Sequence, residues 1–157
     1  MLLVEGDLRR PSLTHIFGLG HIEGVCEWLQ GVNNPHTACN VYRLKELNLW
    51  ILPAGKCPTT PLELLQSDKL PQLIDQLSET FDWIIVDSPP MLPLADTSVW
   101  TRMIDGILLV TRRGTTEKKQ LAAATHALEH EKLLGAILNC SKSSIYQRYY
   151  YEPSSAA

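Results

Sequence analysis

The chain has 157 residues, of which 45% are apolar and 20% are charged, values that are ordinary for a globular protein with one sizeable core. Its 14 Lys and Arg against 17 Asp and Glu give a formal net charge of −3, so it lacks the basic excess of a general nucleic-acid-binding surface. No apolar run approaches the ~18 residues of a membrane-spanning helix, and the first residues do not have the pattern of a signal peptide.

Five short apolar runs are predicted to be β-strands. They are rich in Ile, Leu and Val and are nearly continuous, which is typical of strands buried on both faces of a parallel sheet. In chain order they are LLVEGD (2–7), LNLWILP (47–53), WIIVD (83–87), GILLVTR (106–112) and LLGAILN (133–139).

Helical patterns separate these runs. Short helices are predicted at 24–31, closed by Gly31, at 61–65 and at 96–103. Two longer helices are expected to be capped by Ser67 and Thr116, with apolar faces built from Leu70, Leu73, Ile74 and Leu77 and from Leu121, Ala124, Thr125 and Leu128.

This alternation predicts βαβ units and an α/β fold, a mostly parallel sheet with helices on both faces. Residues 32–46 show no period and are expected to form a loop. Residues 1–140 would form the folded domain, and the polar, aromatic residues 141–157 a tail.

The four cysteines are widely spaced and match no zinc or redox motif. They are Cys26, Cys39, Cys57 and Cys140. We expect them to be reduced structural thiols of a cytoplasmic protein.

Acidic residues end two of the predicted strands. Glu5 and Asp7 end the first run, and Asp87 ends WIIVD. Ligands of open parallel sheets bind at the carboxyl ends of the strands, and neighbouring strands are about 4.8 Å apart. These carboxylates can therefore share one ion, and hard oxygen ligands suit Mg²⁺. The alternative is that Asp87 only forms a turn or caps a helix.

Two further observations bear on this predicted ion site: the arginines that follow Asp7, and the absence of a phosphate-binding motif. Arg9 and Arg10 are either solvated charges or partners of nearby carboxylates, or they contact a phosphate or another subunit. A nucleotide site of this kind needs a phosphate loop, G-x-x-x-x-G-K-[ST], and the 157 residues contain none.

The order of several segments resembles the catalytic domain of bacterial tyrosine autokinases (BY-kinases), deviant P-loop ATPases that control capsule and exopolysaccharide synthesis. The resemblance covers residues 2–151. It rests on VEGDLRRPSL, FGLGHIEGVCEWLQG, LWILPAGKCPTTPLELLQS, FDWIIVDSPPMLPLAD, DGILLVTRRGTT, LLGAILN and a tyrosine cluster, in that order.

The resemblance implies a P-loop NTPase-like fold, the cofactors ATP and Mg²⁺, and roles for single residues. Asp7 and Arg9 match one nucleotide motif, D-x-D-x-R, in which Glu5 stands where the family usually has Asp. Asp87 matches a second motif, D-x-x-P. Asp7 and Asp87 would hold the metal, and Glu5 or Asp7 would accept the tyrosine proton. Asn139 would contact adenine, unless it is only a turn former.

The family places its phosphate loop upstream of the acidic strand. We therefore expect the first strand, 2–7, to lie inside the sheet beside a neighbour that carries the loop. That neighbour would belong to the missing part of a truncated gene or to another chain. By itself this chain should bind ATP weakly and transfer little phosphate.

The tail carries a tyrosine cluster, which in the family is the autophosphorylation substrate of a neighbouring subunit. The cluster is Tyr146, Tyr149, Tyr150 and Tyr151. The resemblance implies self-association through the tail and a membrane adaptor, the chain-length determinant, at the inner face of the membrane. The alternative for the tail is a sticky disordered segment or a sheet-edge patch.

Two other functions are kept open. One is a nucleotide-dependent positioning or partitioning ATPase, which shares the acidic strands but has no use for the tyrosines. The other is a non-catalytic partner that donates its tail to intact kinase subunits.

Overall fold

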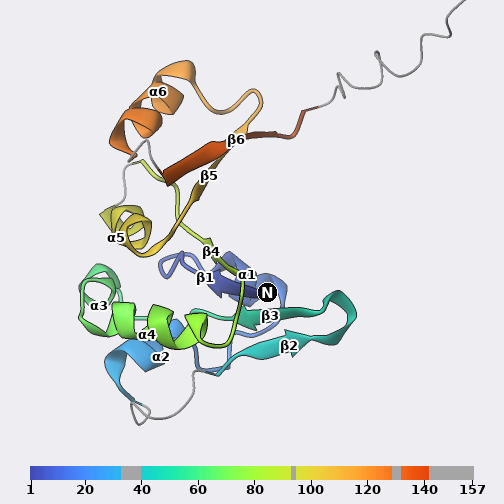
Figure 1. Ribbon diagram of the computed structural model, residues 1–157, viewed down its shortest axis with the longest axis vertical. Helices are drawn as coiled ribbons and strands as arrows, with labels where there is room; N and C mark the ends of the chain where they lie inside the picture. Colours follow the sequence, from blue (N-terminus) through green and yellow to red (C-terminus); the bar gives the residue numbers. More distant parts are fainter. Residues whose placement is uncertain (33–39, 93–94, 129–131, 142–157) are drawn as a thin grey trace, which may run out of the picture. The chain divides into compact units, whose positions relative to one another are not determined.

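A computed structural model describes residues 1–32, 40–92, 95–128 and 132–141 (Figure 1). The chain divides into two compact units, Met1–Ile104 and Asp105–Ala157. The predicted α/β class with mostly parallel strands is confirmed. The five predicted strands all form, but they are distributed over two sheets.

The first unit contains a four-stranded sheet in the order β2-β3-β1-β4. β1 (Leu2–Glu5) lies in its interior, parallel to both β3 (Leu49–Leu52) and β4 (Ile84–Asp87). The prediction that the first apolar run is an interior strand is confirmed. Both neighbours of β1 belong to this chain, so the expectation of a phosphate-loop strand directly beside it is wrong.

The expectation that residues 32–46 form a loop is also wrong for residues 42–46, which form regular structure. β2 (Tyr42–Leu44) pairs antiparallel with β3, and the 3₁₀ helix η1 (Lys45–Leu47) follows it. The chain turns at Asn48, which has a left-handed φ of 48°, a conformation that Asn tolerates better than most residues. A strand of three residues is too short to show a period in the sequence.

In the part of the first unit that the structure describes, the α-helices are α1 (Ser12–Ile16), α2 (Val25–Gln30), α3 (Leu62–Leu65), α4 (Lys69–Ser78) and α5 (Ala95–Met103). Figure 1 shows α2, α3 and α4 side by side, and their contacts agree. Gly31 closes α2 with a φ of 72°, as predicted. The core between helices and sheet includes Leu2, Val4, Val25, Leu52, Leu70, Leu73 and Trp100.

Both predicted helix caps are wrong. Asp68 and not Ser67 precedes α4, and the Ser67 hydroxyl donates to the carbonyl of Leu64 at 2.6 Å. Thr116 accepts a hydrogen bond from the backbone N–H of Arg112 at 3.0 Å, so Glu117 takes the cap position. In each case the hydroxyl has a partner in the preceding turn, which competes with the cap.

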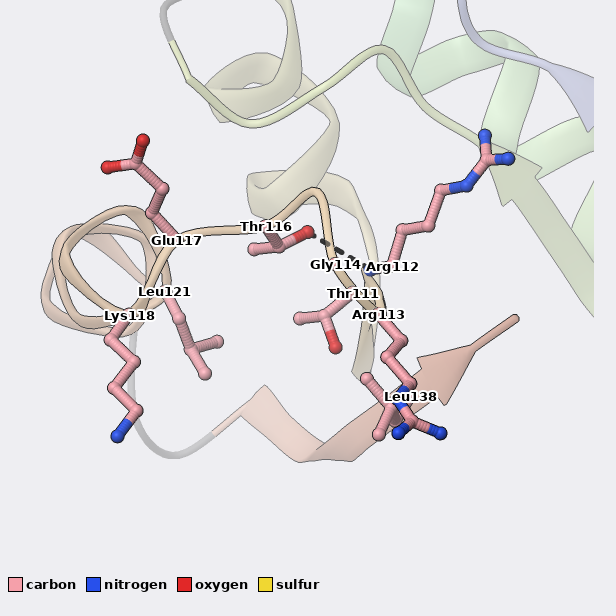
Figure 2. A pocket seen from close by; sticks show the side chains of 9 residues that line it. All are labelled: Thr111, Arg112, Arg113, Gly114, Thr116, Glu117, Lys118, Leu121 and Leu138. Carbon is pink, nitrogen blue, oxygen red and sulfur yellow. Dashed lines mark hydrogen bonds between the residues drawn. The ribbon is translucent and has the colours of Figure 1, made fainter. Parts of the chain in front are cut away.

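The described residues of the second unit include a parallel strand pair and the α-helix between its strands. β5 (Ile107–Arg112) pairs with β6 (Leu133–Asn139), and α6 (Lys118–Ala127) lies between them in the chain. Where β5 leads into α6, the surface has a hollow of about 220 Å³. Figure 2 shows the residues that line it, among them Arg113, Leu138 of β6 and Lys118 of α6. None of the predicted site residues lines this hollow.

Three of the apolar strands are not buried on both faces, in contrast to the prediction. In β4, β5 and β6 every second residue is exposed near the start of the strand, among them Ile85, Leu108, Val110 and Leu134. β1 is the strand that comes closest to the predicted burial. Apolarity on both faces of a strand therefore does not by itself mean that this chain covers both faces.

The expectation that the cysteines are all reduced is wrong for two of them. Cys26 of α2 and Cys57 of the loop after β3 form a disulfide. Cys140 is free and exposed, and Cys39 lies outside the described residues. The two bonded cysteines are 31 residues apart, and a spacing of that length does not reveal that the segments meet.

Within the described ranges, no helix has both the length and the apolar character that crossing a bilayer requires.

Candidate active site

The acidic ends of β1 and β4 lie next to each other. The two strands run parallel, with Glu5 and Asp87 as register partners at their last residues. The backbone N–H of Gly6 donates to the carbonyl of Asp87 at 2.8 Å. A Cβ at Gly6 would come within 2.7 Å of Val86 Cγ1 and 2.9 Å of Asp87 O. Glycine is therefore required at this position for the two strand ends to stay in contact.

Glu5 is a fully buried carboxyl group with one free oxygen. Its Oε2 accepts a hydrogen bond from the backbone N–H of Thr14 at 2.9 Å. Its Oε1 has no hydrogen-bond partner within the described residues. Burial raises the pKa of Glu5, and the negative charge of Asp87 adds to the rise. A buried acceptor without a partner is costly, so this oxygen is suited to a cation or a donor that arrives with a ligand.

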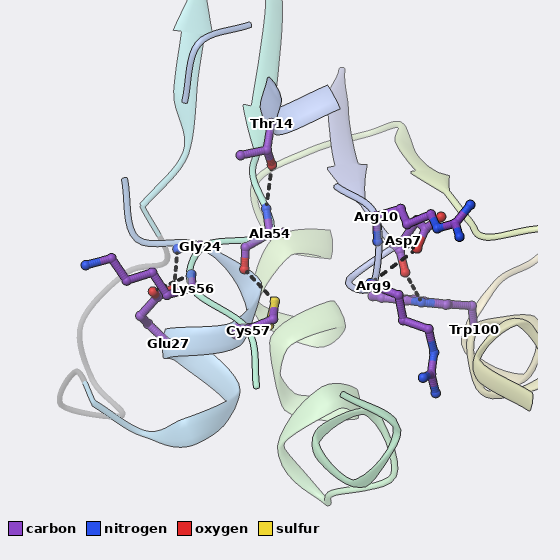
Figure 3. The surroundings of a disulfide bond; sticks show 12 residues. Asp7, Arg9, Arg10, Thr14, Gly24, Glu27, Ala54, Lys56, Cys57 and Trp100 are labelled. Atoms are coloured by element: carbon purple, nitrogen blue, oxygen red, sulfur yellow. Dashed lines mark hydrogen bonds between the residues drawn. A yellow bond between two sulfur atoms is a disulfide. The ribbon is translucent and has the colours of Figure 1, made fainter. Parts of the chain in front are cut away.

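Asp7 orders the turn that follows β1. Its Oδ1 accepts the backbone N–H groups of Arg9 at 3.2 Å and Arg10 at 2.9 Å (Figure 3). Although Asp87 is exposed as a residue, the surrounding protein desolvates its carboxyl group. This desolvation, together with the charge of Asp7, raises the pKa of Asp87. The three predicted acids therefore lie close enough to influence one another electrostatically.

The acids fit a magnesium ion that is shared with a ligand better than a site made of protein alone. Among the described residues no three Asp, Glu, His or Cys side chains are grouped to hold a metal. Mg²⁺ commonly takes only one or two protein carboxylates and completes its shell with water and phosphate oxygens. Neighbouring carboxylates and a free buried oxygen satisfy that lower requirement.

Arg9 faces helix α5 through an ion pair. Its Nε and Nη2 donate to the two carboxylate oxygens of Asp96 at 2.6 and 3.1 Å, and the side chain of Asp96 is only 2% exposed. Asp96, with the charge of Asp7 as a smaller contribution, raises the pKa of Arg9. This geometry favours the alternative in which Arg9 is the partner of a carboxylate, and its role in nucleotide binding stays a prediction.

Trp100 provides a second contact between α5 and the acidic turn. Its indole Nε1–H donates to the carbonyl of Gly6 at 3.1 Å (Figure 3). Neither Asp96 nor Trp100 was singled out from the sequence, and neither was Thr14. A Trp at the inward position of a predicted helix is a signal of burial, but nothing in the sequence indicates which carbonyl it reaches.

The other predicted site residues are not brought to this site by the described structure. Asn139 ends β6 in the second unit, where its Oδ1 accepts the backbone N–H of Cys140 at 2.7 Å. Its contact with adenine stays a prediction. The tyrosine cluster at 146–151 lies outside the described residues.

The raised pKa values predict a stability that falls as the pH rises. Because folding raises the pKa of Glu5 above its ordinary 4.5, the native state holds the proton more tightly than the unfolded state. The stabilisation is complete below the unfolded pKa and is lost as the pH rises through the folded pKa. Urea unfolding from pH 4 upward should show this loss, and Glu5→Gln should reduce it.

Glu63 provides the matched control, since it is exposed on α3. Glu63→Gln should leave the pH dependence of the wild-type chain unchanged. An equal flattening in both variants would contradict the assignment to Glu5.

No protein-family model matches the chain, but individual relatives do. It is 35% identical over 153 residues to the tyrosine-protein kinase YwqD of Bacillus subtilis (strain 168), covering 96% of this chain and 64% of YwqD. It is 30% identical over 156 residues to the putative tyrosine-protein kinase CapB of Staphylococcus aureus, covering 96% of this chain and 68% of CapB. The chain thus spans about two thirds of the length of these relatives.

Solved structures of a kinase domain and of a related ATPase are also similar to this chain. The VpsO kinase domain superposes with a TM-score of 0.80 at 32% identity, over 88% of this chain and 68% of the other. The cell division ATPase MinD of Pyrococcus furiosus superposes with a TM-score of 0.66 at 27% identity, over 91% and 61%. The P-loop NTPase-like fold expected from the sequence is thereby confirmed.

Proposed function

Because the chain belongs to the family of bacterial tyrosine-protein kinases, we propose that it forms the acidic part of an ATP-dependent tyrosine kinase site. The observation that carries this proposal is the register of Glu5 with Asp87 at the ends of two parallel strands, with Asp7 on the adjoining turn. Kinases transfer phosphate mainly by positioning and charge neutralisation, and strand-end carboxylates would serve these purposes through the Mg²⁺ ion that they hold.

In the proposed mechanism, Asp7 and Asp87 would hold Mg²⁺, directly or through water. When bound, the ion supplies positive charge that neutralises the phosphates. Glu5 or Asp7 accepts the proton of the tyrosine hydroxyl, whose ordinary pKa is about 10. The raised pKa of Glu5 makes this carboxylate a stronger base than an exposed one.

The phosphate loop is the part that the 157 residues do not supply. We propose that it comes from polypeptide outside this sequence, and that the chain alone transfers little phosphate. β4 is an end strand of the four-stranded sheet, so one of its edges can still pair with another strand.

The proposed substrate is the tyrosine cluster of a neighbouring copy, Tyr146, Tyr149, Tyr150 and Tyr151. The family and the names of its members support a role in capsule or exopolysaccharide synthesis. We further propose a membrane adaptor as partner, which would keep the chain at the cytoplasmic face of the membrane. Each phosphate adds about −1.5 to −2 charges, so a ring held together by docked tails should loosen as the cluster is modified.

Radiolabelled ATP tests this proposal in two forms of the protein. The chain alone should give little phosphotyrosine. The chain fused behind the phosphate-loop segment of a family member should label its tail, and Asp87→Asn should lower that labelling by about 10²-fold or more, as loss of a charge-stabilising group does. Asp82→Asn, an exposed acid just before β4, is the matched control and should have little effect.

The same experiment separates the alternatives. Strong labelling of the chain alone would contradict the proposed need for an outside loop. Tail labelling by an intact kinase that survives Asp87→Asn would favour the non-catalytic partner. The likeness to MinD favours a positioning ATPase as the second candidate. In that case the fusion would hydrolyse ATP, and changing the four tyrosines to Phe would have no effect.

A further inference from the structure

The Cys26–Cys57 disulfide joins α2 to the loop that follows β3. Cys26 is buried in α2, whereas Cys57 is half-buried in the loop that follows β3. Their Cα atoms are 5.2 Å apart, within the usual range for a disulfide. The bond therefore fixes the loop against the start of α2.

A second set of contacts holds the same loop without the disulfide. The carboxylate of Glu27 accepts the backbone N–H groups of Gly24 at 2.8 Å and Lys56 at 2.7 Å (Figure 3). The loop passes over this carboxylate at Gly55, whose φ is 75° and where any Cβ would collide with Glu27. Reduction of the disulfide would thus leave the loop attached, but less firmly.

A continuous series of hydrogen bonds leads from the disulfide to Glu5. The backbone N–H of Cys26 donates to the carbonyl of Ala54 at 2.9 Å. The N–H of Ala54 donates to Thr14 Oγ1 at 3.0 Å, and the N–H of Thr14 donates to Glu5 Oε2 at 2.9 Å. Ala54, Thr14 and Glu5 are all buried, so water does not compete for these bonds.

We propose that Cys26 and Cys57 form a reversible thiol–disulfide exchange site, and that its redox state sets how firmly Thr14 holds the Glu5 carboxylate. The reagent would be a small dithiol or a thiol of the glutathione type. The consequence for catalysis rests on the proposed function, but the exchange and its structural effect do not.

The exchange is a two-electron reduction. A reagent thiolate attacks Cys57 Sγ, a new S–S bond forms to the reagent, and the Cys26–Cys57 bond breaks. The electron pair leaves on Cys26 Sγ, which takes up a proton. The second thiol of a dithiol, or a second glutathione molecule, then attacks the reagent sulfur of the mixed disulfide. Cys57 is released and takes up a proton, and the reagent leaves as its disulfide.

Burial decides which sulfur is attacked. Cys26 is fully buried, whereas Cys57 is partly open and follows the exposed Lys56, whose positive charge favours an approaching thiolate. The reagent should therefore be found on Cys57. Because the leaving sulfur is buried among apolar groups, its thiolate is poorly stabilised and the exchange should be slow.

The first test uses the folded full chain with reduced glutathione or dithiothreitol, followed by alkylation and mass spectrometry. We expect glutathione on Cys57, alkylation of both cysteines after dithiothreitol, and return of the bonded peptide with oxidised glutathione. Exchange that occurs only in urea, or glutathione attached to Cys26, would overturn the proposed site.

The second test measures amide hydrogen exchange of the oxidised and reduced chain by NMR, without nucleotide. The amides of Ala54 and Thr14 should exchange up to about tenfold faster after reduction, the change given by the loss of one hydrogen bond of ordinary strength. The amide of Gly6, which donates to Asp87, should change much less. Cys26→Ser with Cys57→Ser should reproduce the reduced state, and Cys140→Ser should change nothing.

An equal rise at Gly6, Ala54 and Thr14 would show that the disulfide only stabilises the whole unit, and would overturn the coupling to Glu5. Since neither test contains ATP, they are independent of the kinase assay. If the chain fused behind a phosphate-loop segment labels no tyrosine while Ala54 and Thr14 still change selectively, the proposed function is rejected and this inference stands.

Discussion

Replacing Trp100 with Ala is expected to lower the free energy of unfolding by about 3–5 kcal/mol, the usual range for a buried Trp. The side chain is 1% exposed and belongs to the core of the first unit. Its loss leaves a cavity and also removes the donor that the carbonyl of Gly6 uses. The effect should reach the acidic site, because Gly6 separates Glu5 from Asp7.

Urea unfolding followed by far-UV circular dichroism measures this change. Trp83→Ala is the matched control, because Trp83 is 72% exposed and exposed substitutions usually change stability by about 0.5 kcal/mol or less. Trp100→Phe separates the two causes, since it keeps most of the bulk and loses only the donor, at a cost of about 1–3 kcal/mol. Equal losses at Trp83 and Trp100 would contradict the structure.

The sequence predicts the strands and helices well, because the residues that pack into a core recur at regular spacings along each element. Each of the five apolar runs forms a strand, and the periodic segment around Leu70 and Leu73 forms α4. What the pattern does not contain is the partner of each polar group. Ser67 and Thr116 had the right residue types for caps, but nearby backbone groups took up their hydroxyls.

For the candidate site, too, the sequence predicts which strand ends meet but not the partners of the polar side chains. The acids at the ends of 2–7 and 83–87 could be expected to meet, because parallel strands present their carboxyl ends at one edge. The hydrogen bonds and ion pairs that hold this region in place could not be predicted. Thr14 reaches Glu5 from α1, and Asp96 lies 87 residues from Arg9. Such pairs depend on packing between elements, which a single sequence does not specify.

The ion pair between Arg9 and Asp96 leads to the second large effect. Arg9→Leu leaves the carboxylate of Asp96 buried without its partner. A fully buried broken pair costs about 3–5 kcal/mol, and since the Arg9 side chain is 35% exposed, water can reach part of the site and the expected loss is smaller than that. Arg10→Leu is the control, because the exposed Arg10 contributes only its backbone N–H to the turn.

A double variant shows whether Arg9→Leu loses stability because the buried carboxylate of Asp96 is left without a partner. Arg9→Leu with Asp96→Leu removes both partners, so it should recover much of the stability that Arg9→Leu loses, as replaced buried pairs often do. Urea unfolding of the two single variants and the double variant measures the coupling. If the losses of the single variants simply add, the ion pair contributes little, and Arg9 is available for the phosphate contact that the resemblance implies.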